Sequence, residues 1–166
     1  MIYTITFNPS LDYYLKVNNL KSGAVNRSST EKLTVGGKGI NVSLELKELG
    51  DENETLGFLA GFTGQAIREN IDLLGLKNDF IEVEGRSRIN VKIKSVAETD
   101  VNGVGANVTT NDIKKLTQKL KAKLKEGDWV IISGSAKSEA GDMASANVID
   151  DLRGLDGVNF VVDAGG

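Results

Sequence analysis

The chain has 166 residues, of which 40 % are hydrophobic and 26 % are charged, and its formal net charge is −3. These values are ordinary for a soluble globular domain, and they exclude a bulk attraction to nucleic acid or anionic lipid and a bilayer span, which needs ~18 apolar residues in a row. The chain contains no Cys and no His. Disulfides and Ser–His or Cys–His catalysis are therefore excluded within it, and a zinc site is improbable. Because it has no Cys, we expect a cytoplasmic protein.

Apolar runs separated by glycine-rich turns predict the elements of the chain in order. In the first half we predict strands at 2–7, 13–17 and 32–35, a helix at 39–49, a strand at 54–58, a turn at 60–64 and a helix at 65–74. Extended segments follow at 79–83 and 88–96, and then a glycine-containing loop at 99–106. The last predicted elements are a helix at 110–125 capped by Thr110, a strand at 128–132, a helix at 143–152 and a strand at 158–162.

This order of elements predicts the fold class. Apolar strands that alternate with helices are typical of a parallel-rich sheet covered by helices. The segments 13–35 and 88–101 break the alternation, and the strand at 88–96 has alternating apolar and polar residues. We therefore expect an α/β fold in which these two segments form a small separate sheet.

A glycine-rich turn, VGGKGIN at 35–41, lies where a predicted strand meets a predicted helix. Glycines let the backbone approach a ligand closely, and a helix N-terminus favours an anion. Lys38 adds a mobile positive charge, and Asn41 offers donors and an acceptor to a polyhydroxyl ligand. The spacing matches neither the nucleotide P-loop nor the dinucleotide fingerprint. The pattern alone leaves two interpretations open, an anion site and a tight structural turn.

Three further polar segments could carry binding residues. Asp12 follows the first predicted strand and could accept hydrogen bonds from two sugar hydroxyls, or cap a surface turn. Arg88 suits a phosphate through its bidentate guanidinium, and a solvated charge at a strand edge is the alternative. Ser135 ends the turn SGS after the predicted strand at 128–132, and an ordinary turn is the alternative there. Because three of the four segments follow predicted strand ends, we expect them to converge on one sheet edge.

Six segments occur in an order and spacing that resemble a known family. They are TFNPSLDY, VNR, GGKGINVS, GFLAGFTG, SRINVKI and ISGS. Together they resemble the N-terminal half of ribokinase-like PfkB kinases, and especially the 1-phosphofructokinase and tagatose-6-phosphate kinase branch. The resemblance implies a ribokinase-like α/β fold that is truncated before its C-terminal half, with a parallel-rich sheet flanked by helices. It also implies a β-sheet lid formed by about 13–35 and 88–101.

The resemblance assigns roles to single residues. The residues that it implies for substrate binding are Asp12, Gly37, Lys38, Asn41, Arg88, Asn90, Ser135 and Arg27. Asp12 would bind sugar hydroxyls, and Arg88 and Asn90 would hold the substrate from the lid. Arg27 matches a lid arginine that in some members reaches the substrate site of a neighbouring subunit. The lid of this family often forms a dimer interface, so the resemblance implies a homodimer.

The same comparison indicates which parts the chain lacks. The family's catalytic base is an Asp in a late Gly-Ala-Gly-Asp turn, whereas residues 163–166 read DAGG. We therefore expect neither a catalytic residue nor a metal ligand here, with ATP and Mg²⁺ implied only for a longer parent. The expected function is ATP-dependent phosphorylation of a ketohexose phosphate by that parent, with this chain holding the sugar phosphate without turnover. The alternative is a non-catalytic sugar-phosphate-binding or dimerisation module.

Overall fold

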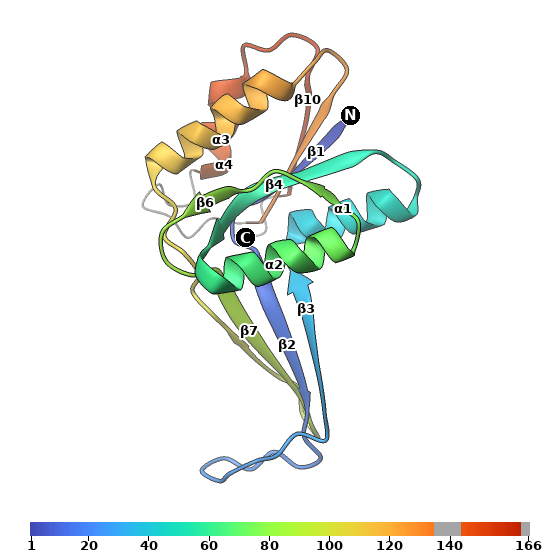
Figure 1. Ribbon diagram of the computed structural model, residues 1–166, viewed down its shortest axis with the longest axis vertical. Coiled ribbons are helices and arrows are strands. Elements are labelled where there is room, and N and C mark those ends of the chain that lie inside the picture. Colours follow the sequence, from blue (N-terminus) through green and yellow to red (C-terminus); the bar gives the residue numbers. More distant parts are fainter. Residues whose placement is uncertain (135–143, 164–166) are drawn as a thin grey trace.

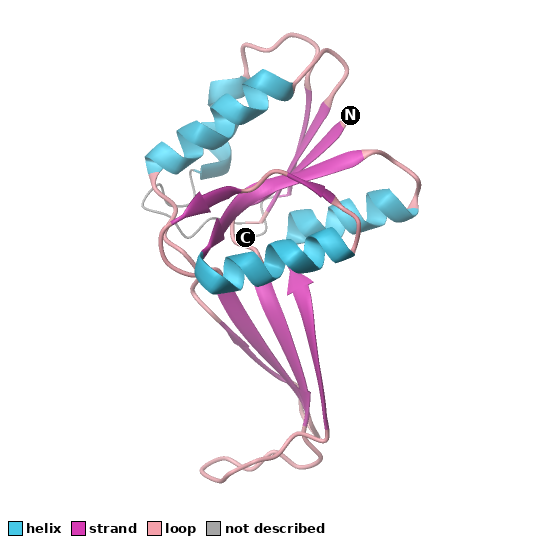
Figure 2. Cartoon of the chain, viewed as in Figure 1, coloured by secondary structure: helices cyan, strands magenta, loops and turns pink. Residues whose placement is uncertain are grey.

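The structure, a computed structural model, describes residues 1–134 and 144–163. It contains a larger sheet covered by helices (Figure 1) and a smaller sheet that extends away from them (Figure 2). This arrangement confirms the predicted α/β class with a parallel-rich sheet and a second small sheet. Among the described residues, no helix has the length and apolar character needed to cross a membrane.

The described elements divide between the two sheets and the helices. The larger sheet contains β1 (Ile2–Thr6), β4 (Asn53–Ala60), β5 (Lys77–Asn78), β6 (Ile81–Val83), β9 (Trp129–Ser133) and β10 (Asn159–Asp163). The small sheet contains β2 (Ser10–Lys16), β3 (Thr30–Gly36), β7 (Arg88–Lys94) and β8 (Thr99–Asn102). The helices are α1 (Lys38–Glu48), α2 (Gly61–Leu73), α3 (Thr110–Lys123) and α4 (Ala144–Leu152).

All paired strands of the larger sheet are parallel in the described part of the chain. Their order is β10-β9-β1-β4-β5, and β6 pairs with the end of β4. The register aligns Thr6, Ser133 and Asp163 at the carboxyl ends of three neighbouring strands. Open parallel sheets bind ligands at this edge, so the edge is the first place to look for a site.

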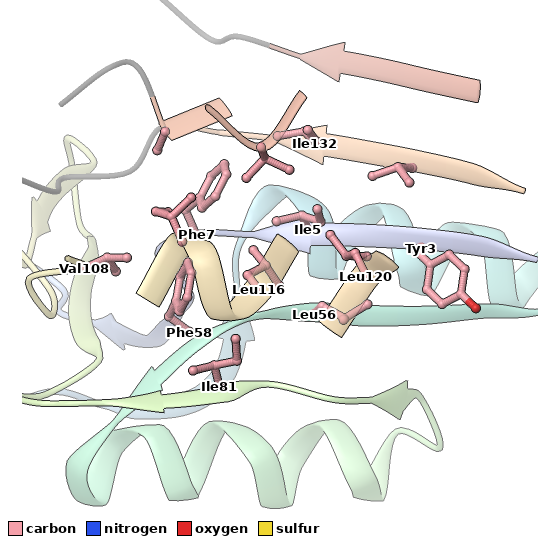
Figure 3. Packing of buried hydrophobic residues seen from close by; sticks show 14 of the residues in the cluster. Tyr3, Ile5, Phe7, Leu56, Phe58, Ile81, Val108, Leu116, Leu120 and Ile132 are labelled. Carbon is pink, nitrogen blue, oxygen red and sulfur yellow. The ribbon is translucent and has the colours of Figure 1, made fainter. Parts of the chain in front are cut away.

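Helices pack on both faces of the larger sheet. On one face, Leu116 and Leu120 of α3 lie against Ile5 of β1 (Figure 3). On the other face, α1 and α2 enclose a second cluster that includes Ile40 and Ile67. All five side chains are fully buried, and burial of an aliphatic side chain of this size contributes about 1.5–3 kcal/mol. The helices therefore fix the sheet whose edge carries the polar residues.

The small sheet has one apolar and one polar face. Its order is β3-β2-β7-β8, with β2 antiparallel to β3 and parallel to β7. The register places apolar residues of neighbouring strands together, and the apolar face consists of Leu11, Tyr13, Leu15, Leu33, Val35, Ile89, Val91, Ile93 and Val101. Leu11 packs into the cluster under α2. Part of the face is exposed, with exposed fractions of 49 % for Leu33, 42 % for Ile89 and 58 % for Val101.

Two predicted loops are wrong. Residues 99–102 form β8, which pairs with β7 although all four of its residues are exposed. Its strand character comes from the neighbouring strand rather than from an apolar pattern of its own. Residues 61–64 form the first turn of α2 instead of a separate turn. The glycines there permit close packing, because a Cβ on Gly61 would lie 2.7 Å from the carbonyl oxygen of Gly85.

The N-cap of α3 also differs from the prediction. Thr109, and not Thr110, caps α3, because its hydroxyl accepts from the backbone N–H of Asp112 while the Asp112 carboxylate accepts from the N–H of Thr109. This capping box needs an acidic residue three positions after the cap, and Ile113 occupies that position for Thr110. Residue 143, the predicted start of the fourth helix, lies outside the described residues, and α4 is described from Ala144.

Four charged side chains connect α3 to the larger sheet. Lys123 Nζ lies 2.8 Å from Glu54 Oε1 and 2.8 Å from Asp79 Oδ2, and Lys119 also contacts Asp79. Burial alone raises the pKa of Asp79, but the hydrogen bonds from Lys119 and Lys123 outweigh it and hold that pKa below its ordinary value. A carboxyl whose pKa is lowered by folding stabilises the folded state above its unfolded pKa, and this contribution is lost as the pH falls through the folded pKa.

We predict that Asp79→Asn lowers the free energy of unfolding by ~0.5–1 kcal/mol near pH 7, since the pair is partly exposed. The difference from the wild type should be smaller at an acidic pH below the lowered folded-state pKa, where Asp79 is protonated. Urea unfolding at both pH values measures it. Asp150→Asn, which removes the exposed helical pair with Arg153, is the control and should cost only a few tenths of a kcal/mol. A loss for Asp79→Asn that is the same at both pH values would contradict the account.

Candidate functional site

The two sheets meet at the polar segment 8–12. β1 ends at Thr6 and β2 begins at Ser10, so the chain passes almost directly from the carboxyl edge of the larger sheet into the small sheet. In the small sheet, Ser10 pairs with Gly36 on one side and with Arg88 on the other. Since α1 follows Gly36 immediately, the register brings the start of α1 and the start of β7 next to segment 8–12.

The carboxylate of Asp12 is the centre of a hydrogen-bonded cluster on the polar face of the small sheet. Its Oδ1 accepts hydrogen bonds from Ser10 Oγ at 2.7 Å and from Asn90 Nδ2 at 2.8 Å. Asn90 is buried, and its Oδ1 accepts from the backbone N–H of Gly103 at 3.2 Å. Among the described residues none donates to Asp12 Oδ2. One oxygen therefore fixes the side chain, and the other is available to a hydroxyl donor.

Arg88 lies beside this cluster. Its Nε donates to the carbonyl oxygen of Asn8 at 3.1 Å, and the Asn8 side chain donates to the carbonyl of Val104 at 3.1 Å. The side chain is half-buried, and this burial lowers the pKa of Arg88 while the Asp12 carboxylate opposes the shift. An arginine remains charged at any physiological pH. The cluster therefore combines a fixed positive charge with a carboxylate, an arrangement that suits a ligand carrying both phosphate and hydroxyl groups.

The first turn of α1 lies against the end of β1. A Cβ on Gly39 would lie 2.5 Å from Thr6 Oγ1 and 2.6 Å from the carbonyl oxygen of Ile5, so only glycine fits there. Gly37 has φ +135°, a conformation that favours glycine, and no side chain caps the helix at this position. The first amide groups of α1 are consequently not occupied by a capping side chain. Uncapped amides at a helix N-terminus attract anions.

Lys38, the first residue of α1, reaches across the sheet edge. Its Nζ lies 3.4 Å from Oδ2 of Asp163, the last residue of β10. Gly134 lies beneath the lysine stem, because a Cβ at that position would be 3.8 Å from Lys38 Cδ. The ammonium is thus close to the carboxyl ends of β9 and β10.

The predicted site residues fall into three groups. Asp12, Asn90 and Arg88 lie together on the polar face of the small sheet, and Gly37 and Lys38 lie in the adjacent turn. Asn41 on α1 and Arg27 in the connection between β2 and β3 are exposed, as Lys38 is. Within the described part of the chain, Arg27 has no hydrogen bond or ion pair with the other predicted residues. Ser135 lies outside the described residues.

Two residues of this region have no binding role in the sequence analysis. Asn8 holds Arg88 through its carbonyl oxygen, and Asp163 holds Lys38. Both follow a predicted strand directly, which is the same signal that marks Asp12. Asp163 is also the first residue of the segment DAGG, which does not match the base motif of the family. The position after a predicted strand therefore marks both residues as candidates. The sequence does not show that Asn8 contacts Arg88 or that Asp163 contacts Lys38.

The profile of the pfkB family of carbohydrate kinases matches residues 6–162. The chain belongs to this family. The family predicted from the six sequence segments is therefore confirmed. This match covers both the polar cluster on the small sheet and the Lys38 turn.

Curated members of the family resemble the chain over much of its length. The 1-phosphofructokinase of Bacillus subtilis strain 168 is 40 % identical over 165 residues, which cover 93 % of this chain and 54 % of that protein. The tagatose-6-phosphate kinase of Staphylococcus epidermidis RP62A is 30 % identical over 100 % of this chain and 54 % of that protein. The chain therefore spans about half the length of the curated relatives that it matches.

Solved structures share the fold. A Staphylococcus aureus protein that was proposed to be a phosphofructokinase matches with a TM-score of 0.89 and 40 % identity, over 99 % of this chain and 53 % of that one. Phosphofructokinase-2 of Escherichia coli, solved with substrates and products, gives a TM-score of 0.89 at 21 % identity, over 99 % of this chain and 54 % of that one. The second likeness shows the fold alone. Together they confirm the ribokinase-like arrangement expected from the sequence.

We predict that Gly39→Ala lowers the free energy of unfolding by about 1–3 kcal/mol, because the added Cβ must displace α1 from β1. Thermal or urea unfolding measures the loss. Gly154→Ala is the matched control, since no atom lies within 4 Å of a Cβ built there, and its effect should stay within about 0.5 kcal/mol. Equal stability of the two variants would show that the turn is not constrained by Thr6 and Ile5.

Proposed function

We propose that this chain carries the sugar-phosphate-binding part of an ATP-dependent ketohexose-phosphate kinase, of the 1-phosphofructokinase or tagatose-6-phosphate kinase type. One observation carries the proposal. The Asp12 cluster, which suits sugar hydroxyls, lies directly beside the uncapped N-terminus of α1, which suits a phosphate. The relatives named 1-phosphofructokinase and tagatose-6-phosphate kinase support this choice of substrate class.

The two ends of the ligand have different requirements. A carboxylate oxygen can accept hydrogen bonds from sugar hydroxyls, and we assign this role to Asp12 Oδ2, with Ser10 and Asn90 holding the carboxylate in place. We assign the phosphate to Lys38, Arg88 and the first amides of α1, since each adds positive charge or N–H donors. The small sheet would then cover the sugar as a lid. Gly37 and Asn41 would line the same site.

The described residues form no cluster of metal-ligating side chains. No group of three or more His, Cys, Asp or Glu side chains gathers within residues 1–134 and 144–163. We therefore derive no step through magnesium or ATP. The proposal assigns both to the part of the longer relatives that this chain does not span, together with the catalytic base. The proposed role of this chain is substrate binding, and we propose a cytoplasmic location because the chain itself has no cysteine.

A second copy of the chain is the partner that we propose for the apolar face of the small sheet. Three large apolar side chains on this face are 42–58 % exposed, and an exposed apolar sheet face of this kind favours association. A tetrameric form is known for phosphofructokinase-2 of Escherichia coli, which shows that a protein of this fold can associate. Arg27 lies at the far end of the same sheet, where a partner copy would be near it.

We predict that the 166-residue chain binds fructose 1-phosphate but does not phosphorylate it when ATP and Mg²⁺ are added. Isothermal titration should give an affinity that falls at least about tenfold in Asp12→Asn, because the variant loses charge-assisted hydrogen bonds to hydroxyls. Asp100→Asn, which removes a carboxylate from β8 of the same sheet, is the control and should keep the wild-type affinity. Steady-state formation of ADP and a bisphosphate would show that the chain is catalytically complete. Equal affinities of Asp12→Asn and the wild type would contradict the role assigned to Asp12.

We predict that Leu33→Asp shifts the chain from dimer to monomer in light scattering coupled to size-exclusion chromatography. A charge at the centre of an apolar interface loses its water without gaining a partner. Lys32→Asp places the same residue one position away on the opposite face of β3 and should leave the dimer intact. A wild-type chain that is monomeric, or an identical shift in both variants, would contradict the proposed interface.

A further inference from the structure

The ion pair between Lys38 and Asp163 joins two elements that are distant in the sequence. Lys38 begins α1, Asp163 ends β10, and their Nζ and Oδ2 atoms are 3.4 Å apart. The end of β10 is itself held, because the backbone N–H of Gly134 donates to the carbonyl oxygen of Asp163 at 3.2 Å. The carboxylate therefore comes from a fixed strand end, whereas the ammonium is on a long flexible side chain.

Solvent exposure makes this pair weak. The side chains of Lys38 and Asp163 are 52 % and 60 % exposed, and an exposed ion pair contributes at most about 1 kcal/mol. A phosphate group carries up to two negative charges and can meet the first amides of α1 at the same time. A phosphate at this position would therefore compete with the carboxylate for the ammonium. Breaking the pair costs the ligand a small part of its binding free energy.

We propose that Asp163 is a positioning residue, which holds Lys38 over the ends of β9 and β10 and releases it to the phosphate group of the ligand. This inference rests on the proposed function, because it assumes that Lys38 receives a phosphate. The carboxylate lowers the affinity of the site for phosphate-containing ligands by keeping the ammonium engaged when the site is empty. Its removal frees Lys38 and strengthens binding.

The expected change follows from the strength of the pair. Removing a competing contact worth at most about 1 kcal/mol tightens binding by about two- to fivefold. The effect should fall as salt rises, since exposed charges are screened over about 8–10 Å at moderate ionic strength. A second route to the same change is direct repulsion of the phosphate by Asp163. Tighter binding through release of the ammonium depends on Lys38, whereas tighter binding through loss of direct repulsion does not.

A double-mutant cycle separates the two routes. Isothermal titration at low salt compares the wild type, Asp163→Asn, Lys38→Met and the double variant, with fructose 1-phosphate and inorganic phosphate as probes. We expect two- to fivefold tighter binding of both probes by Asp163→Asn, weaker binding by Lys38→Met, and no gain from Asp163→Asn in the Lys38→Met background. Asp156→Asn removes the same charge from the turn before β10 and should leave the affinity unchanged.

Three results would overturn the inference. They are an unchanged or weaker affinity in Asp163→Asn, a gain of the same size in the Lys38→Met background, and an equal gain in Asp156→Asn. Failure of the proposed function looks different. In that case the wild type binds inorganic phosphate but not fructose 1-phosphate, and the phosphate data alone decide the role of Asp163. The absence of binding of either probe to every variant contradicts both.

Discussion

The hydrogen bond from Asn90 to Asp12 is the interaction on which the candidate site depends. It links β2 and β7, two strands that are parallel neighbours although 78 residues separate their paired side chains. Ser10 and the amide of Gly103 complete the cluster, so that three chain segments, β2, β7 and the residue after β8, fix the position of one carboxylate. In the described part of the chain, Ser10 Oγ and Asn90 Nδ2 donate to the Asp12 carboxylate, and these hydrogen bonds hold the side chain in place. Without them Asp12 would be a solvated aspartate with many conformations.

A backbone constraint places the second half of the site. The start of α1 approaches β1 so closely that the Gly39 position tolerates no side chain, and Gly37 has a left-handed φ of +135°. This approach brings the amides of α1 to the carboxyl edge of the larger sheet, where Asp163 also lies. The polar face of the small sheet and the helix N-terminus consequently meet at one point. Neither element alone would distinguish a sugar phosphate from any other anion or polyol.

Particular residues show what the sequence could and could not predict. The buried strands and the helix with Leu116 and Leu120 follow from hydrophobic periodicity, which is a local property. The sequence assigns 88–101 to the small sheet, but it does not show β8 as a separate strand, because the four residues of β8 are exposed and its structure depends on β7. The prediction of a separate turn at 60–64 is wrong, because Gly61 packs closely against Gly85, a contact between distant segments that the local sequence does not show. The joint order of several motifs predicts the family. The ion pair between Lys38 and Asp163 is visible only in the three-dimensional structure.

The central claim is that the small sheet and the start of α1 together bind a sugar phosphate. The most direct measurement is an amide NMR titration of the chain with fructose 1-phosphate. The account predicts the largest shifts at Asp12, Lys38 and Asn90. Shifts confined to the cavity of about 830 Å³ between β6 and α3, which is lined by residues that include Glu84 and Asp112, would contradict it.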